Sequence, residues 1–323
     1  MKAILQDEYG DSPDVLRLAE IDKPDPGARE VLIRIEAASL FVGDWHVMTG
    51  LPYAVRPKLG LRRPNARVAG QEMAGVVEAV GAGATMFQAG DDVFGTCEGA
   101  FADYVAAPES LLARKPANLS FQHAATVAIT GTTALQAVRD KGNVQPGQTA
   151  LIIGAAGGVG SFAVQIAKAL GARVTGVCNT AQVDLVRSIG ANDAIDYTQV
   201  DFTEIGRRWD LIVETAGARA LTDLRRTLTP SGTLVIVGGE GGGRWVGKAG
   251  RMVWAPMLSR FSSQTLRTLA VKHNGADLVV LRDLIEEGKV KPVIGKTYPL
   301  VQVPDAMRDL KTAPSQGKVV IAV

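Results

Sequence analysis

A glycine-rich turn between two short apolar segments, within residues 149–178, constrains the fold of this chain more than any other feature. Residues 150–153 form an apolar run rich in branched side chains, typical of a buried parallel strand. Residues 159–170 have the pattern of a helix and residues 172–178 that of a second strand. The turn between the first strand and the helix contains Gly157, Gly158 and Gly160. This β-α-β order predicts a backbone that approaches a diphosphate at a helix N-terminus.

The match to the G-x-G-x-x-G dinucleotide pattern is partial, because Ala155 stands at the first glycine. Its position between a strand and a helix still favours a dinucleotide site over a turn that serves only helix-on-sheet packing. NAD sites have a carboxylate about 20 residues after the glycines. Here Asn179 and Thr180 follow the second strand, and the first acid is Asp184 in the next helix. Since no carboxylate there would repel a 2′-phosphate, we predict a preference for NADP(H).

Length and composition exclude several classes of protein. A chain of 323 residues predicts about two domains, and 46% hydrophobic residues are enough for sizeable cores. A net charge of +2 gives no reason to expect a nucleic-acid partner. No apolar run approaches a membrane span, and acids appear early at the N-terminus, so we expect a soluble cytoplasmic protein. Cys97 and Cys178 are too few for a disulfide framework.

The pattern of secondary structure changes along the chain. Up to Pro116, short β-type runs alternate with turn clusters, which is typical of an antiparallel, barrel-like sheet. Residues 121–140 are helix-like, and strands and helices then alternate as in a doubly wound parallel sheet. We expect further strands over 194–197, 210–214 and 233–237 and helices over 183–189 and 221–228. Near the C-terminus we expect helices over 277–287 and 304–310 and strands over 292–298 and 318–323. Spacing alone leaves open which sheet these last elements join.

Two segments carry basic residues without an acid. The first lies between His46 and Gln71 and contains Arg56, Lys58, Arg62, Arg63 and Arg67. The second, residues 241–276, contains Arg244, Lys248, Arg251, Arg260, Arg267 and Lys272, interleaved with Trp245, Met252, Trp254 and Met257. Such segments are usually solvated faces or oligomer interfaces. Alternatives are a rim that attracts an anionic substrate or an acidic carrier protein and, for the second segment, binding to a membrane surface.

Several motifs together identify a family. They are Ala37-Ala38-Ser39 with Gly43-Asp44-Trp45-His46, the sequence GQEMAGVV at 70–77, GDDVFG at 90–95, residues 155–160, Asp196-Tyr197, and GKVV at 317–320. With them the chain resembles, over essentially its whole length, the zinc-independent, quinone oxidoreductase-like branch of the medium-chain dehydrogenase/reductase superfamily. The resemblance implies a GroES-like catalytic domain, formed by residues 1–120 and 263–323, around a Rossmann domain of residues 121–262. It also implies an active-site cleft between the domains and a homodimer joined through the Rossmann sheets.

The same alignment bears on zinc and on the cofactor. Zinc-dependent relatives bind their catalytic metal through Cys, His and Cys where this chain has Phe41, Gln71 and Ile129, so we expect no zinc. Phe41 also replaces an Asn that quinone reductases often have near the nicotinamide. Many relatives place Lys or Arg just beyond Thr180 to hold the 2′-phosphate, and this chain has Ala181, Gln182 and Val183. The predicted NADP preference therefore depends on Asn179, Thr180, Tyr197 and Lys318. Further cofactor contacts are expected from Thr130, Gly157, Gly158, Val159, Val237 and Gly238.

The chemistry favours a conjugated acceptor. Hydride transfer to an isolated ketone develops an alkoxide, which zinc stabilises, whereas a quinone, enone or enoyl compound spreads the charge and needs only hydrogen-bond donors and a proton source. We predict Tyr53 as the first candidate donor and His46 as the second, with Phe41, Asp44 and Trp45 lining the substrate pocket. Asp44 has an alternative capping role, and a surface role is equally compatible with His46. A redox-silent NADPH sensor or partner-binding protein and a metal-free alcohol dehydrogenase remain the alternative functions.

Overall fold

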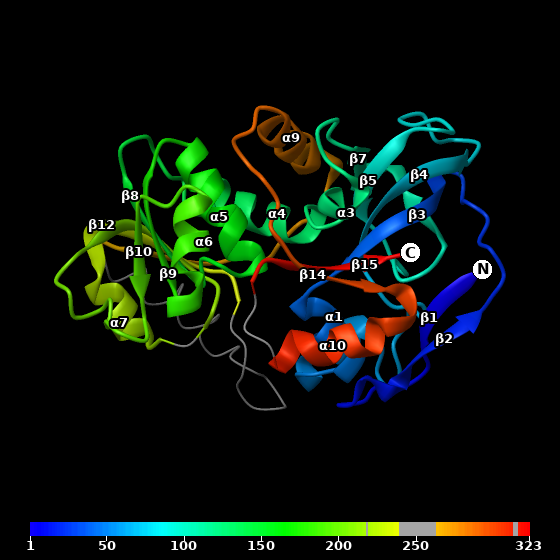
Figure 1. Cartoon of the computed structure of the whole chain (residues 1–323), viewed down its shortest axis with the longest axis horizontal. Coiled ribbons are helices and arrows are strands. Elements are labelled where there is room, and N and C mark those ends of the chain that lie inside the picture. Colours follow the sequence, from blue (N-terminus) through cyan, green and yellow to red (C-terminus); the bar gives the residue numbers. More distant parts are fainter. Residues whose placement is uncertain (218, 239–262, 313–315) are drawn as a thin grey trace. The chain divides into compact units, whose positions relative to one another are not determined.

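The computed structural model of the chain describes residues 1–217, 219–238, 263–312 and 316–323 (Figure 1). Most of the second basic segment, including all of its Trp and Met residues, lies outside these residues. The chain divides into two compact units. The first comprises Met1–Ile129, His273–Glu286 and Pro292–Val323, and the second comprises Thr130–Lys272 and Glu287–Lys291. None of the helices in the described ranges is long and apolar enough to cross a membrane.

The first unit is built on a seven-stranded sheet. Its order is β14-β15-β3-β4-β5-β7, with β6 paired to β3 as well. The strands are β3 (Glu30–Leu40), β4 (Glu72–Val80), β5 (Asp92–Thr96), β6 (Tyr104–Pro108), β7 (Leu112–Arg114), β14 (Ile294–Pro299) and β15 (Lys318–Ala322). A separate antiparallel pair consists of β1 (Lys2–Gln6) and β2 (Leu16–Glu20). The antiparallel prediction for the segments before Pro116 is confirmed. The C-terminal pair β14–β15, for which no direction was predicted, is parallel.

Strand β3 organises this sheet. It is 11 residues long, and it pairs with β6 at its first half, with β15 at its second half, and with β4 along its length. Ile33, Ile35 and Leu40 are buried in the core of the unit. The pairing of β15 with β3 answers the question that spacing left open, because the C-terminal strands return to the first unit.

Helices and short 3-10 turns complete the first unit. They are η1 (Pro13–Val15), α1 (Val42–Thr49), η2 (Tyr53–Val55), α2 (Arg56–Leu59), η3 (Glu109–Leu111), α3 (Phe121–Ala124), α9 (Gly275–Glu286), η6 (Leu300–Gln302) and α10 (Val303–Thr312). Helix α4 (Ala128–Leu135) and the π-helical segment η4 (Gln136–Lys141) follow α3, so the helix expected over 121–140 is broken into three parts.

The second unit is a parallel sheet of the order β10-β9-β8-β11-β12-β13. Its strands are β8 (Thr149–Ile153), β9 (Arg173–Cys178), β10 (Asp193–Asp196), β11 (Trp209–Glu214), β12 (Leu228–Ile236) and β13 (Thr265–Thr268), with α5 (Gly158–Ala169), η5 (Thr180–Gln182), α6 (Val183–Ser188) and α7 (Leu221–Arg226). The doubly wound prediction is confirmed. The bounds expected for one helix (221–228) and the next strand (233–237) were wrong, because α7 ends at Arg226 and β12 begins at Leu228. Strand β13 was not predicted.

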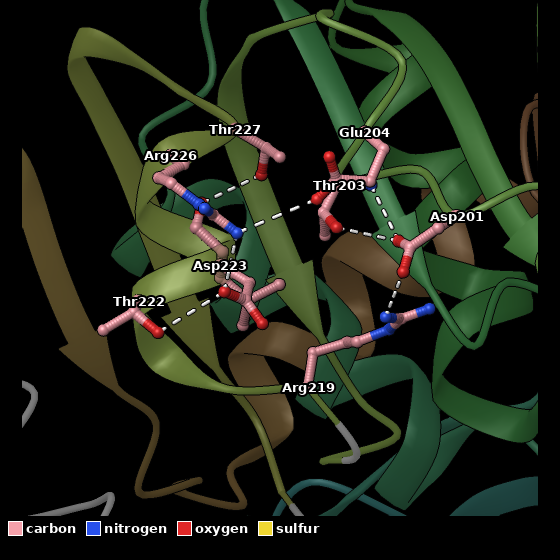
Figure 2. Close-up of polar contacts among 9 residues, drawn as sticks. Asp201, Thr203, Glu204, Arg219, Thr222, Asp223, Arg226 and Thr227 are labelled. Carbon is pink, nitrogen blue, oxygen red and sulfur yellow. Dashed lines mark hydrogen bonds and ion pairs between the residues drawn. The ribbon is translucent and has the colours of Figure 1, made fainter.

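A polar network fixes the long connections of the parallel sheet, as Figure 2 shows. Asp201, in the loop after β10, accepts hydrogen bonds from the backbone N–H and the hydroxyl of Thr203. It also forms an ion pair with Arg219, in which Asp201 Oδ2 lies 2.6 Å from Arg219 Nη1. Arg219 precedes α7 and also stacks on Phe202, which is fully buried in the core. Together these contacts join the loop that follows β10 to the segment that leads into α7.

Candidate functional site

The glycine turn of the second unit has the geometry of a diphosphate-binding loop. Gly154, at the end of β8, has φ +80°, and a Cβ on Gly160 would lie 2.0 Å from the carbonyl oxygen of Gly154. Only glycine therefore permits this crossing of strand and helix. Helix α5 follows Gly157 and has no side-chain cap. Its first-turn amides have no intrahelical acceptor and are suited to an anion.

The structure also explains why Ala155 is tolerated at the first glycine of the pattern. Its side chain is fully buried, and its Cβ lies 2.9 Å from where a Cβ on Gly176 of β9 would stand. The methyl group therefore points into the sheet, where Gly176 leaves room for it. The departure from the pattern is compensated by a glycine on the neighbouring strand.

The predicted cofactor residues of the second unit gather at one edge of its sheet. Since β8, β9, β10 and β12 are parallel, their carboxyl ends share that edge. The residues that follow these ends are Gly157, Gly158, Val159, Asn179, Thr180, Tyr197, Val237 and Gly238. Thr130, the remaining candidate of this unit, lies in α4 and is buried. The carboxyl edge of a parallel sheet is where such folds bind nucleotides.

Asn179 carries a direct sign of a ligand. Its Oδ1 atom is buried and has no hydrogen-bond partner among the described residues. A buried acceptor without a donor is costly unless a bound group supplies one. A hydroxyl of the cofactor ribose is such a donor, so the arrangement fits a nicotinamide dinucleotide.

The contacts of Thr180 correct the expectation that no carboxylate lies near the predicted position of the 2′-phosphate. The Thr180 hydroxyl donates to Asp196 Oδ2 at 2.6 Å, and the same carboxylate accepts from Thr198 N and Oγ1. These donors hold the pKa of Asp196 below its usual value. A carboxylate therefore does lie beside this loop, from the next strand in the sheet and not from the next residues in the chain.

Lys318, predicted to contact the 2′-phosphate, is engaged in another interaction. It begins β15 in the first unit, is 3% exposed, and its ammonium group is paired with Glu72. This pairing argues against the predicted contact, and a lysine in the apolar run GKVVIA gives no sign of its buried partner.

That ion pair is the centre of a polar cluster in the first unit. Glu72 Oε1 accepts from Lys318 and, at 3.0 Å, from Ser39, while Glu72 Oε2 accepts from the backbone N of Ile129 at 2.8 Å. The Lys318 ammonium also lies 5.5 Å from the ring centroid of Phe41. Each charge is thus paired and hydrogen-bonded, which a buried ion pair requires. Sequence reasoning missed Glu72, although an acid within the apolar run EMAGVV was a signal.

Asp44 is joined to this cluster and is itself buried. Its Oδ2 accepts from the backbone N of Phe41 at 3.0 Å, and its Oδ1 accepts from Gln71 Nε2 at 3.1 Å. The first contact caps α1, as the alternative reading of Asp44 expected. Burial raises the pKa of Asp44 to about 7, although the hydrogen bonds from Phe41 and Gln71 act in the opposite direction and lower it. Asp44 therefore exchanges a proton near neutral pH.

The three positions of the relatives' zinc ligands are occupied by groups with other contacts. Gln71 donates to Asp44, Ile129 contributes its backbone amide to Glu72, and the ring of Phe41 faces Lys318. Within the described ranges, no three His, Cys, Asp or Glu side chains are grouped so that they could hold a metal.

The two candidate proton donors occupy neighbouring turns. His46, in α1, contacts the carbonyl oxygen of Leu51 through Nδ1 at 2.8 Å. Since a carbonyl only accepts, Nδ1 carries the proton, and Nε2 is left as the atom that exchanges protons. Tyr53 begins η2, is half-buried, and has the guanidinium of Arg56 4.7 Å from its ring centroid. Trp45 is half-buried against the core cluster of the unit.

A pocket of about 120 Å³ opens in the first unit between α1, α2 and residues 64–71. Its polar wall is formed by Gln6, Asp44, Lys58, Asn65, Gln71 and Glu98. Of the predicted pocket residues only Asp44 lines it. Phe41 and Trp45, like both donor candidates, lie outside its wall.

Comparison with known proteins places the chain in a family. Residues 27–117 match the alcohol dehydrogenase GroES-like domain, and residues 189–321 match the zinc-binding dehydrogenase family. The chain is 28% identical to the chloroplast envelope quinone oxidoreductase homolog of Arabidopsis thaliana, over 99% of this chain and 98% of that protein. It is 32% identical to the NADPH-dependent alkenal/one oxidoreductase of the same plant, over 99% of this chain and 79% of that protein.

The fold agrees with these relatives. A crystal structure of an NAD-dependent alcohol dehydrogenase superposes with a TM-score of 0.85 at 29% identity and covers 100% of both chains. The chain has both units and the glycine turn, and its relatives match it over almost its whole length. It therefore belongs to the medium-chain dehydrogenase/reductase superfamily and is a quinone oxidoreductase-like member.

Proposed function

We propose that the protein transfers a hydride from NADPH to a conjugated carbonyl acceptor, a quinone, enone or enoyl compound, without zinc. The observation that carries the proposal is the set Phe41, Gln71 and Ile129 at the positions of the relatives' zinc ligands. Two are hydrocarbons, and the amide of the third is bonded to Asp44. A site without a Lewis acid favours an acceptor that spreads its developing charge.

A bound nicotinamide would supply the hydride; its addition to the β-carbon of the acceptor would shift the C=C electrons and leave negative charge on the carbonyl oxygen. The protein's task is to donate a hydrogen bond to that oxygen and then a proton. Tyr53 is our first choice for this donor, because it carries a phenolic hydroxyl and is half-buried at the start of η2, the turn after α1. His46 is the second choice; because Nδ1 carries the proton of the neutral ring, it donates through Nε2 only as the imidazolium.

The dinucleotide is held, in this proposal, by the amides that begin α5 and by Asn179 Oδ1. The preference for NADPH is supported by the absence of an acid in the loop after β9, which contains the exposed Thr180; Tyr197, which follows β10, is exposed as well. Asp196 acts against this preference, because a charged carboxylate repels a 2′-phosphate. We therefore expect NADPH to bind more tightly than NADH by a margin that Asp196 reduces.

The test is steady-state oxidation of NADPH with a panel of quinones, enones and enoyl thioesters, with zinc measured in the same preparation. We expect turnover of conjugated acceptors, less than about 0.1 zinc per chain, and no effect of chelators. Binding of NADPH without turnover of any acceptor would instead favour the sensor. Oxidation of simple alcohols with about one zinc per chain, lost together with activity, would overturn the proposal.

We also propose that the protein is a cytoplasmic homodimer. The resemblance implies a dimer joined through the parallel sheets, and both cysteines are free and buried, which suits a reducing compartment. Light scattering of the purified protein tests the dimer, and cell fractionation tests the location.

A further inference from the structure

Arg56 is held in an unusually well-defined position on the first unit. Its guanidinium carbon lies 4.5 Å from the ring centroid of Tyr9 and 4.7 Å from that of Tyr53. Its Nε donates to the carbonyl oxygen of Gly50 at 3.0 Å. Gly50 ends α1 with φ +61°, and a Cβ there would lie 2.7 Å from Tyr9 and 2.9 Å from Arg56 Nε. The close approach therefore requires glycine. Two aromatic rings and one carbonyl oxygen therefore contact the guanidinium, and among the described residues no hydrogen bond from its two terminal amino groups is seen.

This cation has no acid partner. In the described part of the chain, no carboxylate pairs with Arg56, whereas Arg17 and Arg67 both pair with Asp7. Lys58, Arg62 and Arg63, in the same acid-free segment, are likewise in no ion pair there. A fixed, half-buried guanidinium in an acid-free basic segment attracts an oxyanion, and its planar fork matches a carboxylate or phosphate with two parallel hydrogen bonds.

The contact with Tyr53 links this cation to the reaction. In the proposed function, Tyr53 donates to the carbonyl oxygen of the acceptor. A negative group on the same small molecule can then reach Arg56, which lies against the Tyr53 ring. We propose that Arg56 binds an oxyanion of the acceptor, so that the preferred substrates are conjugated carbonyl compounds that carry a carboxylate or phosphate. This inference rests on the proposed function and names its substrate class.

The experiment compares acceptors with and without an anionic group. For carboxylate the pair is 3-benzoylacrylate and its methyl ester, and for phosphate it is crotonyl-CoA and the uncharged N-acetylcysteamine thioester of crotonate, all with NADPH. We expect the wild type to prefer the charged member of at least one pair. Arg56→Gln should lower kcat/KM for that member by about 10-fold to 100-fold, mainly through KM, and change the neutral member less than 3-fold.

Two further variants separate a specific contact from general charge or a structural role. Arg63→Gln removes an exposed cation of the same segment and should change neither acceptor more than 2-fold. Arg56→Lys keeps the charge without the planar fork and should give an intermediate loss. Equal losses on the charged and neutral acceptors in Arg56→Gln would assign Arg56 to support of Tyr53 and overturn the inference.

A measurement on the wild type covers the case in which the variants fail to fold. The saturated analogue 3-benzoylpropionate should inhibit reduction of the ester competitively, and at least 10-fold more strongly than its amide. Equal inhibition by acid and amide would contradict an oxyanion site. If neither member of any pair is reduced, the proposed function itself fails. Reduction of the neutral members with no preference for charge would reject the Arg56 inference alone.

Discussion

At the scale of single residues, proton delivery depends on the two neighbouring turns that carry His46 and Tyr53. General acid assistance is typically worth about 10² to 10⁴ in rate. We expect Tyr53→Phe to lower kcat for an enone at least tenfold and to leave NADPH affinity near the wild-type value. The loss on a quinone should be smaller, because water can protonate its reduced oxygens. If Tyr53→Phe and His46→Ala each keep full kcat on an enone, water delivers the proton.

Asp196 provides a second prediction at this scale. Its carboxylate accepts from the Thr180 hydroxyl, so Asp196→Asn removes a negative charge beside the loop that follows β9 and leaves an oxygen to accept from Thr180 or Thr198. We expect the variant to bind NADPH more tightly by a factor of about 3 to 10 and NADH with an unchanged Kd. Fluorescence titration of both cofactors measures the ratio, and an equal change in both Kd values would contradict this account.

At the scale of elements, the crossing of β8 and α5 depends on Gly160. A Cβ there would meet the backbone oxygen of Gly154 at 2.0 Å, a contact that requires the strand or helix to move. We expect Gly160→Ala to destabilise the protein by about 2 kcal/mol or more and to weaken dinucleotide binding at least tenfold. Gly147→Ala is the control, because it has φ +84° but nothing within 4 Å. It should cost only about 1 kcal/mol and leave binding unchanged.

At the scale of the whole molecule, the titration of Asp44 should appear in the stability. Because burial raises the pKa of Asp44 from its ordinary value of 3.8 to about 7, the folded protein holds a proton between these pH values that the unfolded chain has lost. The contribution of Asp44 to the free energy of unfolding is therefore fully present below about pH 4 and is lost as the pH rises towards 7. Between pH 5 and 8 the wild type should lose on the order of 2 kcal/mol relative to Asp44→Asn.

Urea unfolding of both proteins at the two pH values measures this difference. A constant difference between wild type and Asp44→Asn would show that Asp44 stays charged in the folded state at both pH values.

The doubly wound sheet, the glycine turn and the antiparallel first domain could be predicted from the amino-acid sequence. These features depend on the periodicity of apolar residues and on glycines that determine the backbone conformation of the few residues around them. The family resemblance and the edge that gathers Asn179, Thr180 and Tyr197 were predictable for the same reason. The tertiary structure alone decided which charges meet. Lys318 pairs with Glu72 across 246 positions of the chain, and Asp196 reaches Thr180 from a neighbouring strand. Charge pairing depends on the distance between side chains in space, and the separation of two residues in the sequence does not give that distance.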